Sequence, residues 1–146
     1  MHDVNFLLVH GAGEEPSVWD GWEGTAIDLQ AGLNVTEASL LNYEAAVTCD
    51  AGLEARPLCL VGRGMGALAV LLAARRVLPA AIALIEPWPP EAPSAQATRP
   101  ESPLALEECR RGLAVPEPDA PVLVVEGPAD AYAVLAWARS ASASAM

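Results

Sequence analysis

The sequence predicts an α/β fold built on an open, doubly wound parallel sheet of about five strands. Three observations lead to this prediction. The 146 residues suit a single domain, short apolar runs recur along them, and the segments between the runs are long enough for crossover helices. Most runs are continuously apolar rather than alternating, which is typical of parallel strands that are buried on both faces.

The apolar runs predict strands over residues 5–9, 32–38, 58–61, 80–85 and 121–125, the second being the weakest and a candidate edge strand. Crossover helices are expected over residues 18–30, 43–55, 65–77 and 104–113, and a last helix over residues 129–139. The helix from residue 65 is apolar on nearly every face until Arg75, which indicates that it is central and buried.

One domain is therefore expected over residues 1–139, followed by a flexible tail of alternating Ser and Ala at residues 140–146. Within the domain, residues 86–103 contain Trp88 and six prolines. Proline lacks the N–H that helices and sheets use, so this segment is expected to form an ordered loop or a lid.

Composition excludes several classes of function. The chain has 19 acidic residues and 8 arginines, no lysine, and a formal charge of −11, so it repels nucleic acids and anionic lipid surfaces. No apolar run approaches the ~20 residues of a membrane span, and no signal peptide is visible. Three widely spaced cysteines predict neither disulfides nor a metal site. We expect a cytoplasmic protein without a cofactor, and the bias to Ala, Pro and Arg is typical of a bacterial genome rich in G and C.

Three glycine-containing turns follow predicted strands. His10-Gly11-Ala12-Gly13 follows the first strand, residues 62–66 (Gly-Arg-Gly-Met-Gly) lead into the buried helix, and residues 126–130 (Glu-Gly-Pro-Ala-Asp) follow the last strand. The carboxyl ends of parallel strands are where open α/β sheets bind ligands. Glycines let backbone N–H groups approach a ligand closely, and a helix start adds its positive end.

At these residues the chain resembles the α/β-hydrolase fold family, over about residues 4–139. The turn after His10 is similar to the oxyanion loop of that family, and residues 62–66 are similar to its nucleophile elbow, Gly-x-Ser-x-Gly. Asp130 stands where the family commonly has the acid of its catalytic triad. The resemblance implies the strand order 2-1-3-4-5 of a minimal member, with residues 86–103 as a reduced lid.

The chain departs from the family at two of the three catalytic positions. Gly64 occupies the nucleophile position, and a glycine cannot form an acyl-enzyme. The catalytic His of the family follows a last strand for which this chain has no candidate, and its only histidines are His2 and His10. The sequence therefore predicts that the protein is not a conventional serine hydrolase, and it leaves open whether the protein is an enzyme.

The resemblance still implies a site of oxyanion type. The N–H groups of Met65 and of Ala12 or Gly13 are the expected donors, and Gly11, Gly64, Arg63 and Trp88 are expected to line the site. Asp130, His10 and Glu86 are the candidates for moving a proton.

Each of these side chains also has a structural interpretation that stays open. Arg63 can be an ion-pair partner of Glu86 or Asp130. His10 can shape its loop, and Asp130 can be a turn residue. Glu14 and Glu15 can lie near the site or simply form a solvated loop.

Three functions remain open. The protein can bind a small, largely apolar carbonyl compound and catalyse a non-hydrolytic step such as cyclisation, dehydration or isomerisation. It can be a non-catalytic pseudo-hydrolase that binds a ligand or a partner, or it can hydrolyse esters with directly activated water. A dinucleotide site is disfavoured, because Glu14 and Glu15 would repel a pyrophosphate and Pro16 replaces the third glycine of the motif. Residues 121–125 would form a sheet edge, through which a homodimer is a hypothesis.

Overall fold

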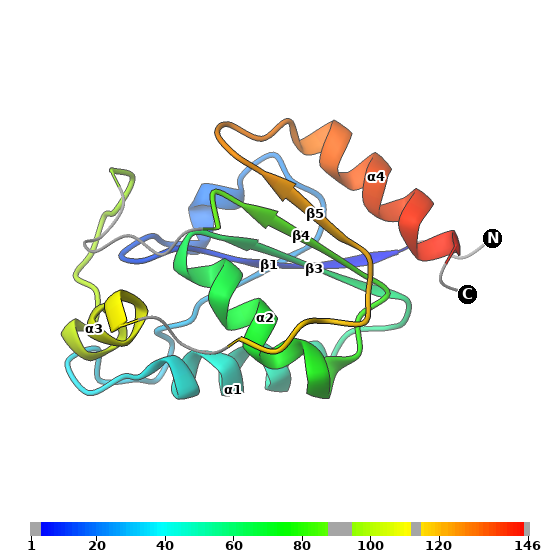
Figure 1. Ribbon diagram of the computed structural model, residues 1–146. Coiled ribbons are helices and arrows are strands. Elements are labelled where there is room, and N and C mark those ends of the chain that lie inside the picture. The colour runs from blue at the N-terminus through cyan, green and yellow to red at the C-terminus, as the bar shows by residue number, and fades with distance from the viewer. Residues whose placement is uncertain (1–3, 88–94, 112–114, 145–146) are drawn as a thin grey trace.

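The computed structural model describes residues 4–87, 95–111 and 115–144, and it confirms the predicted fold class (Figure 1). The five strands are β1 (Asn5–Val9), β2 (Thr25–Ile27), β3 (Leu58–Arg63), β4 (Ala81–Ile85) and β5 (Val122–Val125). All pairs are parallel, and the strand order is β2-β1-β3-β4-β5. Four of the five strands lie where the apolar runs predict them.

The second strand and the first crossover differ from the prediction. The helix expected over residues 18–30 is only a 3-10 turn, η1 (Pro16–Trp19), and β2 follows at Thr25–Ile27. Gly24 explains why a strand replaces the expected helix here, because its φ is +135° and a Cβ at this position would lie 2.8 Å from the Phe6 Cβ. That close approach brings the chain alongside β1, where the register pairs Leu7 with Thr25.

The strand expected over residues 32–38 is also wrong, since these residues form turns. Gly32 has a φ of +72°, which ends any extended run before it starts. The Asn34 side chain then accepts the Thr36 N–H at 3.1 Å, an Asx turn that replaces a sheet hydrogen bond.

The four helices are α1 (Leu40–Ala51), α2 (Met65–Val77), α3 (Pro103–Arg111) and α4 (Ala131–Ser144). The bounds of α2 are those predicted from the sequence. Helix α1 begins three residues earlier than expected, because the Ser39 side chain accepts the Asn42 N–H and the Asn42 side chain accepts the Ser39 N–H. Helix α4 continues through residues 140–144, which the sequence led us to expect in a tail.

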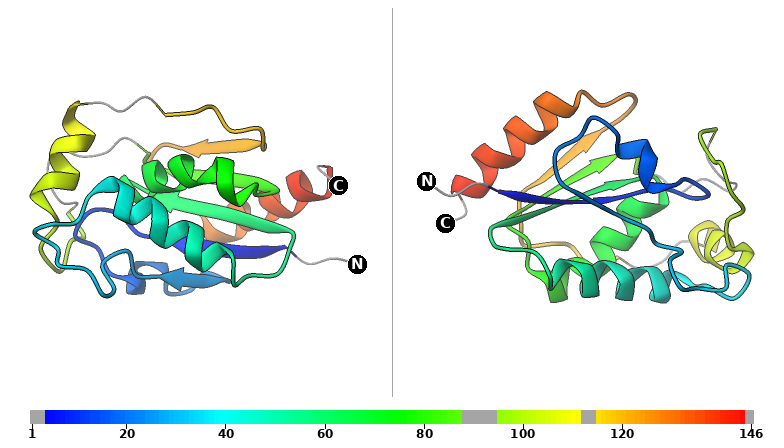
Figure 2. Two further views of the ribbon diagram at one scale, coloured as in Figure 1. Left: turned by 90° about the horizontal axis from the view of Figure 1, so that it is seen from below. Right: turned by 180° about the vertical axis from the view of Figure 1, so that it is seen from behind.

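Helices cover both faces of the sheet, as Figures 1 and 2 show. Helices α1 and α2 pack on one face, where the core includes Leu7, Leu60 and Ile82. Helix α4 and η1 pack on the other face, over Phe6, Val61 and Ile85. No described helix is both long and apolar enough to cross a lipid bilayer.

Helix α3, which connects β4 to β5, does not pack beside α2 on the last strand of the sheet, β5. It sits at the start of α1, where the Glu108 carboxylate accepts the Leu40 N–H at 3.0 Å (Figure 1). It therefore flanks the carboxyl ends of the strands, and no helix among the described residues covers the α2 side of β5 (Figure 2).

Candidate functional site

The turn between β3 and α2 has the backbone of a nucleophile elbow. Gly64 is the N-cap of α2 with φ 54° and ψ −124°, a sparsely populated conformation. The positions on either side, Gly62 and Gly66, have no room for a side chain. An added Cβ on Gly62 would lie 2.6 Å from the Ala67 Cα, and one on Gly66 would lie 2.3 Å from the His10 carbonyl oxygen. At Gly64, by contrast, the nearest atom to an added Cβ is the Gly11 Cα at 3.8 Å. The elbow thus has room for a side chain at the position where the chain has none.

His10 is fully buried, and both of its ring nitrogens are engaged. Its Nε2 accepts the Leu29 N–H at 3.0 Å and lies 3.1 Å from the Arg99 Nη2, which can only donate. Its Nδ1 therefore carries the hydrogen, which it donates to the Gly11 carbonyl at 2.8 Å. With its Nε2 facing two donors, the ring has no free lone pair that could take a proton from a substrate. The geometry supports the loop-shaping role of His10.

Two buried carboxylates accept the N–H groups of the glycine loop. The Glu14 side chain accepts the Gly11 N–H at 2.7 Å, and Glu101 accepts the Gly13 N–H at 2.8 Å. The interpretation of Glu14 as part of a solvated loop is therefore wrong, because this residue is only 1% exposed. The protein's own side chains therefore hold the N–H group of Gly13, one of the expected ligand donors, and that of Gly11, which was expected to line the site.

Glu101 joins three elements at this point. Besides the Gly13 N–H, it accepts the Tyr43 hydroxyl at 2.5 Å and the Ser102 N–H at 2.9 Å. Burial, reinforced by the negative charge of Glu101, raises the pKa of Tyr43 above its usual value. The phenol therefore stays protonated and donates to the carboxylate.

Arg63 is an ion-pair residue, with Glu14 as its main partner. The Arg63 Nε lies 3.1 and 3.0 Å from the two Glu14 oxygens, and its Nη2 donates to the Gln96 side chain at 2.6 Å. Glu86, one of the two partners expected from the sequence, is further away at 3.8 Å. The Glu86 side chain is 45% exposed, so it lies at the rim rather than inside a site.

Asp130, the other expected partner, is exposed and serves as a helix cap. Its Oδ1 accepts the Tyr132 N–H at 3.0 Å, which satisfies a donor in the first turn of α4. Across the described part of the chain, no hydrogen bond or ion pair links Asp130 to the elbow or to the glycine loop. The geometry favours the turn interpretation of this residue.

Residues 96–102 form a strap across the glycine loop. The N–H groups of Thr98 and Arg99 both donate to the Gly13 carbonyl, at 2.9 and 3.2 Å. The Arg99 side chain donates to the Glu14 carbonyl at 3.1 Å and to Asp28 at 2.6 Å. This hydrogen bond holds the pKa of Asp28 below its usual value and raises that of Arg99. The strap therefore covers the glycine loop at the carboxyl end of β1.

The N–H groups of Ala12 and Met65 are the remaining donors of oxyanion type. Neither has an acceptor among the residues that the structure describes, and both residues are only 1% exposed. Trp88, which we expected at the rim, lies outside the described residues. These two N–H groups can polarise a carbonyl oxygen, but because both residues are buried, a ligand reaches them only after the structure opens locally at the carboxyl ends of the strands.

The buried thiols and the acidic side chains of residues 4–87, 95–111 and 115–144 supply neither a reactive nucleophile nor a metal centre. Burial raises the pKa of the Cys59 thiol to about 12, so this cysteine is inert. No group of three His, Cys, Asp or Glu side chains in these ranges is arranged to hold a metal ion.

Comparison with models of protein families found no match, and neither did comparison with proteins of curated function. Solved structures do match. The polyneuridine aldehyde esterase superposes with a TM-score of 0.52 at 19% identity, over 61% of this chain and 42% of that chain. The pyrethroid hydrolase of Sphingobium faniae JZ-2 gives a TM-score of 0.50 at 18% identity, over 58% and 40%.

An extracellular α/β-hydrolase of a Paenibacillus species gives a TM-score of 0.53 at 13% identity, over 62% of this chain and 47% of that chain. This chain thus spans less than half the length of each of the three. Identities this low relate the folds and not the activities. Over the part that superposes, the chain has the fold of the α/β hydrolases.

Proposed function

We propose that the protein is a pseudo-hydrolase, an α/β-hydrolase-like binding module that holds a small molecule without forming an acyl-enzyme. The observation that carries the proposal is Gly64. The elbow around it keeps the conformation that presents a nucleophile, yet the side chain is absent. The candidates for moving a proton support the same conclusion, since His10 has both nitrogens engaged and Asp130 caps a helix.

Turnover is the first test. Purified protein is incubated with a panel of activated short-chain esters, with the Asp130→Ala variant alongside. The proposal predicts hydrolysis no faster than in buffer for both proteins. Hydrolysis by the wild-type protein that the variant loses would contradict the proposal, because it would mean that Asp130 activates water directly.

Binding is the second test. Small, largely apolar carbonyl compounds are screened by thermal unfolding, since a ligand at 100 times its Kd stabilises the folded state by about 2.7 kcal/mol. Gly64→Asn fills the space above the elbow with a residue that tolerates positive φ better than most, so it should abolish the shift. Glu37→Ala, an exposed change in the turns that precede α1, should keep it. A shift that survives Gly64→Asn would place the ligand elsewhere.

A second function, non-hydrolytic catalysis by polarisation of a carbonyl, is favoured by one observation. The buried N–H groups of Ala12 and Met65 have no acceptor among the described residues, and a carbonyl oxygen would satisfy both. The two functions differ in product. Compounds that stabilise the protein are incubated with it and analysed by NMR, and an isomer, cyclised product or dehydrated product would favour catalysis over binding alone.

A further inference from the structure

The α2 side of β5 is exposed although the strand beside it is covered. The register pairs Ile82 with Val122 and Leu84 with Val124, so all four side chains point to the same face. Ile82 and Leu84 are at most 5% exposed beneath the helices, whereas Val122 and Val124 are 39% and 50% exposed. The cause is the position of α3 at the start of α1, which leaves no described helix over the α2 side of β5, whereas α4 covers the other side (Figure 1).

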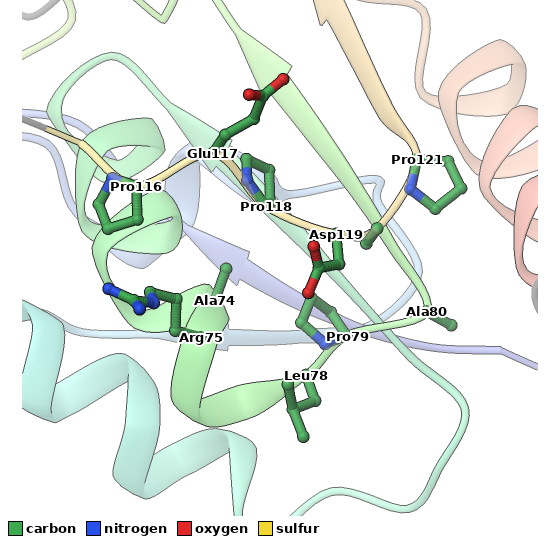
Figure 3. Close-up of a pocket in the computed structure, with 11 residues that line it drawn as sticks. Ala74, Arg75, Leu78, Pro79, Ala80, Pro116, Glu117, Pro118, Asp119 and Pro121 are labelled. Atoms are coloured by element: carbon green, nitrogen blue, oxygen red, sulfur yellow. The ribbon is translucent and has the colours of Figure 1, made fainter.

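A cavity of about 540 Å³ adjoins these valines at the start of β4 and β5, the opposite end of the sheet from the elbow. It lies between the end of α2 and residues 116–121, and four prolines and Leu78 contribute to its lining (Figure 3). Leu78 is 71% exposed. Pro121 lines the cavity and directly precedes Val122, so cavity and valines form one surface. We call this surface the β5 groove.

The β5 groove has a basic rim and an acidic rim. Arg75 in the last turn of α2 lines the cavity on one side, and Glu117 and Asp119 line it on the other. Arg76 follows Arg75 in the same turn of α2 and adds to the positive charge there. All four are exposed, and none forms an ion pair with another described residue. In Figure 3 the Arg75 guanidinium and the Glu117 carboxylate point away from each other.

These two arginines differ from most others in the chain. Five arginines pair with carboxylates: Arg63, Arg99, Arg110, Arg111 and Arg139. In a chain with 19 acidic residues, two adjacent arginines without such a partner stand out. Their position beside an exposed apolar surface is typical of the rim of a protein interface.

We propose that the β5 groove binds a second copy of this chain across a twofold axis. The twofold axis runs along the groove, between its two rims, because this direction sets the basic rim of one copy against the acidic rim of the other. A partner of different sequence would need an acidic rim opposite these arginines and a basic rim opposite these carboxylates. A second copy of this chain provides both by symmetry. The apolar middle of each groove, with Val122, Val124 and Leu78, is then buried against its counterpart. The free edge of β5 lies at the same surface.

The rims allow a charge-exchange test. Variant A carries Arg75→Glu and Arg76→Glu, and variant B carries Glu117→Arg and Asp119→Arg. Each alone sets like charges across both halves of the interface, whereas a 1:1 mixture of A and B sets opposite charges across both halves. The matched control, Asp20→Arg with Glu37→Arg, changes the net charge as B does but at exposed sites away from the groove.

Association is measured by sedimentation velocity over about a hundredfold range of concentration, since mass action populates a dimer as concentration rises. Moderate salt screens the repulsion between copies with a formal charge of −11. We expect the mass of the wild-type protein and of the control to rise from 15.2 kDa toward twice that value. Variants A and B should each associate at least about tenfold more weakly, and the mixture should recover the dimer.

Folding is checked separately, because Arg75 and Arg76 also favour the C-terminal end of α2. Leu78→Asn provides an independent variant: Leu78 has a φ of 54°, a conformation that Asn tolerates better than Leu. It should weaken the dimer while the thermal midpoint at low protein concentration stays the same or rises. A wild-type protein that remains monomeric, variants that associate like the control, or a mixture that does not recover would each overturn the proposal.

Discussion

Glu101→Ala is the change that tests most sharply how the glycine loop is held in place at the carboxyl ends of the strands. Glu101 is 8% exposed and accepts hydrogen bonds from Gly13, Tyr43 and Ser102, which belong to three separate segments. Its removal leaves at least the Gly13 N–H and the Tyr43 hydroxyl buried without their acceptor. A buried donor that loses its partner costs about 1–3 kcal/mol, so we expect a total loss of about 2–5 kcal/mol.

The loss is measured as the free energy of unfolding from urea titrations. It is large against the 5–15 kcal/mol or so that holds a typical domain folded. Tyr43→Phe removes only one of the donors and leaves the carboxylate with the others, so it should cost about 1–2 kcal/mol. The double variant should lose less than the sum of the two, because both changes remove the same hydrogen bond.

Glu37→Ala is the matched control, an exposed carboxylate for which we expect a change within about 0.5 kcal/mol. If Glu101→Ala behaves like this control, the carboxylate does not hold the glycine loop, and the reasoning about how this loop is held in place is refuted. The same holds if the two changes at Glu101 and Tyr43 are fully additive.

Three further predictions concern the elbow, the strap and the thiols. Gly66→Ala would place a Cβ 2.3 Å from a backbone oxygen, so it should destabilise the fold by about 3 kcal/mol or prevent folding, as urea unfolding shows. Arg99 lowers the pKa of Asp28 from its usual 3.8, so the ionised Asp28 side chain stabilises the fold above pH 3.8, and this stabilisation is lost as the pH falls through the lower pKa of the folded state. When the free energy of unfolding is measured against pH, the Asp28→Asn variant should lose less stability in acid than the wild-type protein. A thiol reagent at pH 8 should react quickly with the exposed Cys49 and not with the buried Cys59, and Cys49→Ser should abolish the fast phase.

The sequence predicts the elements whose signal is local. β1 and β4 are continuous apolar runs, and α2 has the bounds that its apolar composition suggests. β2 has only three residues and exists because it pairs with β1, so its own pattern could not reveal it. The start of α1 could have been found, since Ser39 stands three residues before Asn42 and both can cap.

The candidate site divides in the same way. The spacing of the glycines identifies Gly64 and the elbow from sequence alone. Arg99 and Glu101 carry no such signal, because they contact His10 and Gly13 across 89 and 88 residues. Glu14 looks like a solvated acid in sequence, and only the fold brings Arg63 and the Gly11 N–H to its carboxylate.

The central claim is that no other side chain replaces the nucleophile that the elbow lacks, and intact-mass measurement tests it most directly. The protein is incubated with a fluorophosphonate probe, which forms a stable adduct with an activated serine, and an active serine hydrolase serves as the positive control. The account predicts that the mass of this protein stays unchanged, since Gly64 has no side chain to modify. A single stoichiometric adduct would contradict it, because some other residue would then act as an activated nucleophile.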